Sequence, residues 1–240
     1  MDVLISVLEG ASNEEFPAYD NDTIIKSTCL AMFTAAVDTT TVTLIWALSL
    51  LLNNPDALKT AQDELDEYVG RDRLVEEYDI KNLVYLQAII KETLRLYPAA
   101  PISVPRESMD NCIVAGYSIP KGTRLIINLW KLHRDPKIWS DPNQFRPERF
   151  LTSQKDIDVK GQHYELLPFG SGRRMCPGVS FALQSMHLTL ASLIQAFELV
   201  KPSKEAIDMS ESLGLTNMKA SPLQVLLRPR LSINMYHDHT

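Results

Sequence analysis

Residues 169–178 read FGSGRRMCPG, and this stretch decides how the rest of the sequence is interpreted. Proline suits the first position of a helix, so Pro177 predicts that Cys176 lies at a helix N-terminus. The dipole and free amides of a helix N-terminus favour an anion, and the glycines let the preceding loop turn tightly. The segment is therefore suited to hold a thiolate ligand. The alternative is a buried structural cysteine, which is the usual fate of a lone one.

The segments around this stretch differ sharply in pattern. After it, apolar residues recur at helical spacing and predict a final helix over residues 177–197. Before it, residues 129–176 are rich in Pro, Asp, Arg and Gly, so they predict an irregular meander and loop held by specific contacts. Further upstream, prolines separate short β-rich pieces such as IVAGYSI and TRLIIN, which predict a small sheet with hairpins.

A strongly patterned helix is expected over residues 83–96. Glu92 and Arg95 lie three residues apart within it, so they share one helix face and can form a charge-assisted pair. Most such pairs are solvated surface bridges. This pair lies on an otherwise apolar helix, which sets it apart from that majority.

The longest predicted helix covers residues 22–53. Between residues 27 and 52 its only charge is Asp38, so a membrane span is one interpretation. However, a charge at mid-bilayer costs about 2.5–3.5 kcal/mol, and this run also holds six threonines. A helix buried through the middle of a globular domain fits better.

Composition excludes several classes of protein. The formal net charge of -6, without a basic stripe, argues against nucleic-acid binding. Cys29, Cys112 and Cys176 lie far apart without CxxC spacing, which argues against a disulfide framework or a zinc site. Strands and helices do not alternate as in a Rossmann fold. The predicted fold class is mainly α with a minor β-sheet.

At every fixed position the opening stretch resembles the haem-binding signature of cytochromes P450, F-x-x-G-x-R-x-C-x-G. The resemblance implies haem b as the cofactor and Cys176 as the axial ligand of its iron. The implied cofactor-binding residues also include Arg174, which can pair a propionate, Phe169, which can shield the sulfur, and Gly178. Arg106, in the stretch VPRES, aligns with a family residue that commonly reaches a propionate.

Two further motifs of the same family are similar to segments elsewhere in the chain. The sequence Glu92-Thr-Leu-Arg95 resembles the ExxR motif, and residues 147–150, PERF, resemble its downstream partner. The resemblance implies that Arg149 joins Glu92 and Arg95 in one network. Its implied role is structural, because it would lock the meander and the cysteine-containing loop.

The run AAVDTT, residues 35–40, resembles the oxygen-binding segment of the family, A-G-x-D/E-T-T/S. It implies that Asp38 and Thr39 are catalytic, holding a water and relaying protons towards O2. Ala36 replaces the usual glycine, which implies altered groove geometry rather than lost function. The alternative is a threonine-rich core helix whose hydroxyls bond back to its own carbonyls.

Family correspondence also implies a set of residues that line a substrate pocket. They are Phe33, Ala36, Ile102, Val104 and Leu215. Ordinary core packing is the alternative for each of them, and the two interpretations are equally strong. The sequences of these segments are most similar to those of plant microsomal enzymes of specialised metabolism. This similarity implies a small apolar substrate.

Over residues 1–240 the sequence resembles the C-terminal half of the cytochrome P450 fold, which implies a much longer parent. The implied reaction is monooxygenation, which inserts one atom of O2 into a small apolar plant metabolite. Electrons would come from NADPH through NADPH–cytochrome P450 reductase, a flavoprotein. The parent is expected on the cytosolic face of the endoplasmic reticulum membrane, and this chain is expected to lack the anchor. The alternative is a truncated, catalytically incompetent haem-binding fragment.

Overall fold

The computed structural model describes Ser6 and residues 20–236. The chain divides into two compact units, Met1–Thr39 and Thr40–Thr240, and each is described by itself. The expected lack of an anchor concerns the start of the chain, and residues 1–5 and 7–19 lie outside the described residues.

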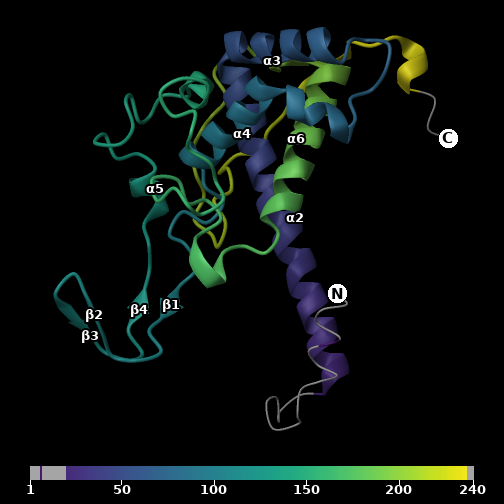
Figure 1. Cartoon of the computed structure of the whole chain (residues 1–240). Helices are drawn as coiled ribbons and strands as arrows, with labels where there is room; N and C mark the ends of the chain where they lie inside the picture. The colour runs from purple at the N-terminus through teal and green to yellow at the C-terminus, as the bar shows by residue number, and fades with distance from the viewer. Residues whose placement is uncertain (1–5, 7–19, 237–240) are drawn as a thin grey trace. The chain divides into compact units, whose positions relative to one another are not determined.

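The described residues are mainly helical. The α-helices are α2 (Asn21–Asn53), α3 (Pro55–Tyr68), α4 (Val84–Leu96), α5 (Leu129–Leu132) and α6 (Val179–Ala196). Short 3-10 helices are η1 (Glu77–Asn82), η2 (Pro147–Phe150), η3 (Gly172–Arg174) and η4 (Ile233–Tyr236). The chain between α5 and α6 is mostly irregular (Figure 1), and its last part is the cysteine-containing loop.

Short antiparallel strand pairs make up the β structure. The pairs are β1 (Arg106–Glu107) with β4 (Arg124–Leu125), β2 (Cys112–Val114) with β3 (Tyr117–Ile119), and β5 (Phe197–Val200) with β6 (Leu226–Pro229). Only Ala115 and Gly116 join β2 to β3, with φ of 49° and 85°. Positive φ at both positions matches the tight hairpin turn that suits strand twist. The predicted class, mainly α with a minor β component, is confirmed.

Helix α4 lies at the centre of the larger unit. It contacts α3, α6 and η2, and Figure 1 shows α3, α4 and α6 packed closely together. Leu86, Ile89 and Ile90 of α4 are completely buried as a result. Because other sides of this helix are covered as well, its polar residues Glu92, Thr93 and Arg95 also lie in the interior.

Only the last part of α2, from residue 40 onward, belongs to the larger unit. That part buries Trp46, Ala47 and Leu51, and the helix ends just before Pro55. By length and composition α2 is also apolar enough to cross a membrane, with 44% of its apolar window buried. Burial of its last turns in a protein core favours a core helix over a membrane span.

The N-terminus of α6 differs from the sequence-based expectation. Pro177 is predicted to be the first helical residue, but the helix begins at Val179 with Gly178 as its N-cap. Cys176 therefore lies two residues before the cap. The reason is local, because Met175 still has an extended backbone and the Cys176 N–H bonds back to the loop.

Candidate functional site

Residues 166–178, called the cysteine loop below, fold back on themselves ahead of α6. The backbone N–H of Gly170 donates to the carbonyl of Leu167 at 3.0 Å. The N–H of Cys176 donates to the carbonyl of Phe169 at 2.9 Å. Gly170 and Gly172 have φ of 76° and 71°, which only glycine adopts without strain. These turns leave the side chain of Cys176 exposed.

The cysteine loop rests on Gly161, a residue that the sequence-based analysis did not single out. The Ser171 hydroxyl donates to the Gly161 carbonyl at 2.6 Å. A Cβ on Gly161 would lie 2.9 Å from both the Gly170 carbonyl oxygen and the Met175 sulfur, and its φ is 77°. Nothing larger than glycine therefore fits beneath the loop without moving it.

We expect Gly161→Ala to displace the cysteine loop and to destabilise the protein more than Gly122→Ala does. Gly122 has a similar φ of 82° but nothing within 4 Å of its virtual Cβ, so its substitution measures backbone strain alone. That strain costs about 1 kcal/mol. Chemical unfolding of both variants checks the prediction, and equal losses of stability would contradict the close approach.

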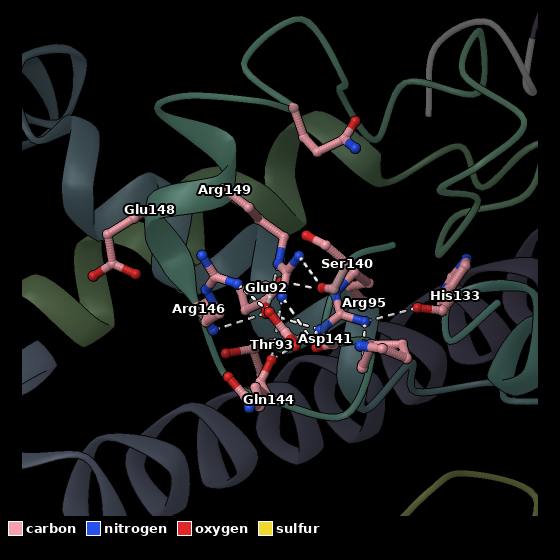
Figure 2. Close-up of polar contacts among 12 residues, drawn as sticks. Glu92, Thr93, Arg95, His133, Ser140, Asp141, Gln144, Arg146, Glu148 and Arg149 are labelled. Atoms are coloured by element: carbon pink, nitrogen blue, oxygen red, sulfur yellow. Dashed lines mark hydrogen bonds and ion pairs between the residues drawn. The ribbon is translucent and has the colours of Figure 1, made fainter. Parts of the chain in front are cut away.

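Glu92 accepts hydrogen bonds from three arginines in the interior (Figure 2). Arg95 donates to both carboxylate oxygens, from Nε at 2.7 Å and from Nη2 at 2.8 Å. Arg149 adds its Nε at 3.0 Å and Arg146 its backbone N–H at 2.9 Å. The exposed fractions of Glu92, Arg95 and Arg149 are 0%, 0% and 3%. The structure thus brings these three predicted residues together.

Backbone carbonyls of the meander balance the excess positive charge of this network. Arg95 Nη1 donates to the carbonyls of His133 and Pro142, at 2.8 and 2.7 Å. Arg149 Nη1 donates to the carbonyl of Ser140 at 2.9 Å. Burial lowers the pKa of Arg149, and the neighbouring Glu92 carboxylate opposes this effect. The side chains of Arg95 and Arg149, rather than regular secondary structure, therefore hold the irregular segment around residues 133–149 in place (Figure 2).

His133 is the second residue that the sequence-based analysis missed. It follows α5 and is completely buried, and its Nε2 accepts the backbone N–H of Leu167 at 3.0 Å. Burial, and then the nearby Arg95 cation, lowers its pKa to about 3. Its spacing from the other histidines fits no metal site, and the stretch 128–136, which is typical of the resembled family, assigned no role to it.

The two arginines that are predicted to bind the cofactor, Arg106 and Arg174, lie at the cysteine loop. Arg106, in β1, donates from Nη2 to the carbonyl of Arg174 at 2.7 Å. The Arg174 residue is exposed at the end of η3. Phe169 is half-buried and packs against the hydrophobic core. Gly178 approaches the thiol, because a Cβ there would lie 3.9 Å from the sulfur of Cys176.

Asp38 and Thr39 lie in the smaller unit, and both are partly exposed. The Thr39 hydroxyl donates to the Ala35 carbonyl at 2.7 Å, which is the contact expected for a threonine in a core helix. Phe33 and Ala36, on the same helix, are exposed.

Three predicted pocket residues lie in the larger unit, and all of them are exposed. Ile102 and Val104 flank Ser103, which has a φ of 56° and accepts the Ile127 N–H at 3.0 Å. Leu215 is 97% exposed on a loop that is anchored next to the same segment. The anchor is the Asn217 N–H, which donates to the Ala99 carbonyl at 2.9 Å.

These residues fit a haem group. A thiolate ligand requires an accessible sulfur, which Cys176 provides. A porphyrin requires uncovered apolar surface, and Phe181, in the first turn of α6, is 72% exposed. Propionates require cations, and Arg106 and Arg174 are held together at the loop. In the described part of the chain, no cluster of three His, Cys, Asp or Glu residues offers a conventional metal site instead.

Comparison with known proteins identifies the family of this chain. The family model for cytochrome P450 matches residues 1–227, so the chain belongs to the cytochrome P450 family. Flavonoid-6-hydroxylase of Ocimum basilicum is 59% identical over 99% of this chain and 44% of its own length. Strychnine-10-hydroxylase of Strychnos nux-vomica is 55% identical over 98% of this chain and 44% of its own length.

Solved structures agree on the fold. A zebra fish cytochrome P450 structure with progesterone has a TM-score of 0.74 and 37% identity, covering 82% of this chain and 44% of that one. A second, with abiraterone, has a TM-score of 0.76 and 36% identity. The chain thus has the fold of part of a cytochrome P450, and it spans less than half the length of the relatives it matches.

Proposed function

We propose that this protein is a haem-thiolate monooxygenase in which Cys176 is the axial ligand of the iron. The observation that carries the proposal is the exposed Cys176 side chain on a loop that fixed hydrogen bonds hold. When bound, haem supplies O2 binding and O–O cleavage, which a thiolate ligand favours. Arg106 and Arg174 would pair the propionates, Phe169 would shield the sulfur, and Gly178 would leave room beside it.

Proton delivery is proposed for Asp38 and Thr39. The Thr39 hydroxyl, oriented by the Ala35 carbonyl, would accept a hydrogen bond from a water that the carboxyl group helps to hold. The support is the resemblance of residues 35–40 to the oxygen-binding segment, together with this hydroxyl orientation. The competing interpretation, a purely structural threonine, makes the same bond to Ala35.

The proposed substrate is a small apolar plant metabolite. Relatives such as flavonoid-6-hydroxylase and strychnine-10-hydroxylase support this class by their names. Five residues are proposed to line its pocket: Phe33, Ala36, Ile102, Val104 and Leu215. The proposed electron donor is NADPH–cytochrome P450 reductase, and the proposed location is the cytosolic face of the endoplasmic reticulum membrane.

The ferrous–CO spectrum of the haem-loaded protein tests the ligand assignment. We expect the red-shifted band of a thiolate complex, and we expect Cys176→His to move it to the shorter wavelength of an imidazole complex. Cys112→Ser is the matched control, because Cys112 is equally exposed but lies on the β2–β3 hairpin. A spectrum that is unchanged in Cys176→His would overturn the assignment.

Thr39→Ala is expected to uncouple turnover, because it removes the hydroxyl that orients the water. NADPH consumption should continue while product per NADPH falls by about tenfold or more and peroxide rises. Thr39→Ser, which keeps the hydroxyl, should retain most of the coupling. Equal coupling in all three proteins would show that Thr39 only packs.

A second candidate function is haem binding without turnover. It is favoured by the exposed apolar side chains in the larger unit, among them Phe181 and Leu215, because such surface promotes association with other chains. Expression of residues 1–240 with haemin and reductase separates the two functions. Coupled product formation supports the monooxygenase, whereas a thiolate spectrum without product supports the second candidate.

A further inference from the structure

His133 joins two parts of the molecule that are far apart in sequence. Its backbone carbonyl accepts Arg95 of the buried network at 2.8 Å, and its ring nitrogen Nε2 accepts the N–H of Leu167 at 3.0 Å. Leu167 belongs to the cysteine loop and is only 6% exposed. One residue therefore contacts both the network around Glu92, as Figure 2 shows, and the segment that carries Cys176.

We propose that His133 is a positioning residue, which sets the conformation of the cysteine loop and so the bond between Cys176 and the haem iron. The inference rests on the proposed function, because it concerns the same ligand. It adds a role for a residue outside the signature, to which the family resemblance assigns no role.

Hydrogen bonds, together with the short backbone segment 167–170, connect His133 to Cys176. The imidazole fixes the Leu167 N–H, and the Leu167 carbonyl accepts the Gly170 N–H at 3.0 Å. The carbonyl of Phe169, two residues after Leu167, accepts the Cys176 N–H at 2.9 Å. A shift of Leu167 would therefore move the residues on which the backbone of Cys176 depends.

The chemistry of the site requires an uncharged hydrogen-bond acceptor at this position. A backbone N–H donates to Nε2, so the proton of the neutral ring lies on Nδ1. Arg95 and Arg134 lie close enough to disfavour a second proton, and burial disfavours it further, as the lowered pKa of about 3 indicates. Without an acceptor, the Leu167 N–H would be buried and unpaired, which is unfavourable.

Three variants of His133 separate positioning from general packing. His133→Gln places an amide oxygen where Nε2 lies, so the bond to Leu167 can be retained. His133→Asn is too short to reach, and His133→Leu has no acceptor. His187→Leu is the control, because His187 is also buried but lies on α6, and its Nε2 has no hydrogen-bond partner in the described residues.

The measurements are the ferrous–CO spectrum of the haem-loaded protein and the thermal unfolding midpoint of each variant. We expect His133→Leu and His133→Asn to lower the ratio of thiolate-type to shorter-wavelength absorbance by about tenfold or more. His133→Gln should restore that ratio. His187→Leu should leave the ratio unchanged, because the Nε2 that it removes has no hydrogen-bond partner in the described residues. If His133→Leu yields no folded protein, the comparison of Gln with Asn decides.

Two results would overturn the proposal. If His133→Asn keeps the wild-type ratio, the bond to Leu167 does not position the loop, although Cys176 can still be the ligand. If the wild-type protein itself lacks the thiolate band, the proposed function fails and this inference fails with it. The two failures are distinguishable, because only the second is seen without any substitution.

Discussion

Replacing Glu92 with alanine is expected to cost about 3–5 kcal/mol of folding free energy and to yield protein with little bound haem. The carboxylate accepts four hydrogen bonds, two from Arg95 and one each from Arg149 and the Arg146 backbone. Its removal would leave two buried guanidinium groups without an anion. A typical domain has only about 5–15 kcal/mol of stability, so the loss is a large share of it.

The control is Asp63→Ala, which removes an ion pair of the same charge type from the surface of α3. Its partner is Lys59, and the side chains are 68% and 58% exposed. Exposed pairs of this kind are worth about 0.2–1 kcal/mol, so this variant should unfold almost as the wild type does. Chemical unfolding and haem content measure both variants. Stable Glu92→Ala protein with normal haem content would contradict a structural role for the network.

The ion-pair network shows what the sequence could predict at the site and what it could not. Glu92 and Arg95 are neighbours on one helix face, so their pairing follows from helix geometry alone. The addition of Arg149 required the family resemblance, because 57 residues separate it from Glu92. The contact between His133 and Leu167 has no comparable signal, because an irregular meander without periodicity places both residues.

The fold, too, could be predicted where it depends on local sequence and could not be predicted where it depends on tertiary contacts. Helical spacing of apolar residues predicted helices over 83–96 and 177–197, and a nearly uncharged run that ends before Pro55 predicted one over 22–53. The structure has α4, α6 and α2 within two residues of those bounds. The start of α6 was placed too early, because a proline fits either a first helical turn or the turn before it. Gly161 was missed because its role depends on tertiary contacts with Met175 and Gly170. The sequence around Gly161 does not indicate those contacts.

We expect the protein to lose stability steeply as the pH falls below about 6.5, because two buried histidines cannot accept protons in the folded state. Burial, and then the Arg95 cation, lowers the pKa of His133 to about 3, and burial lowers that of His187 to about 4. In the unfolded chain both groups titrate near 6.5. Between pH 6.5 and 4 the unfolded state therefore binds more protons, and stability rises with pH in that window.

The slope should approach about 1.4 kcal/mol per pH unit for each histidine, and stability should not change through these two groups above pH 6.5. Glu64 acts in the opposite sense, because burial raises the pKa of its carboxyl group above 4.5. The histidine contribution is therefore measured as a difference between proteins. His133→Gln and His187→Gln do not titrate, so each should flatten the dependence of unfolding free energy on pH, and the double variant should flatten it most. Curves that run parallel to the wild type between pH 6.5 and 4 would show that neither histidine is held neutral by the fold.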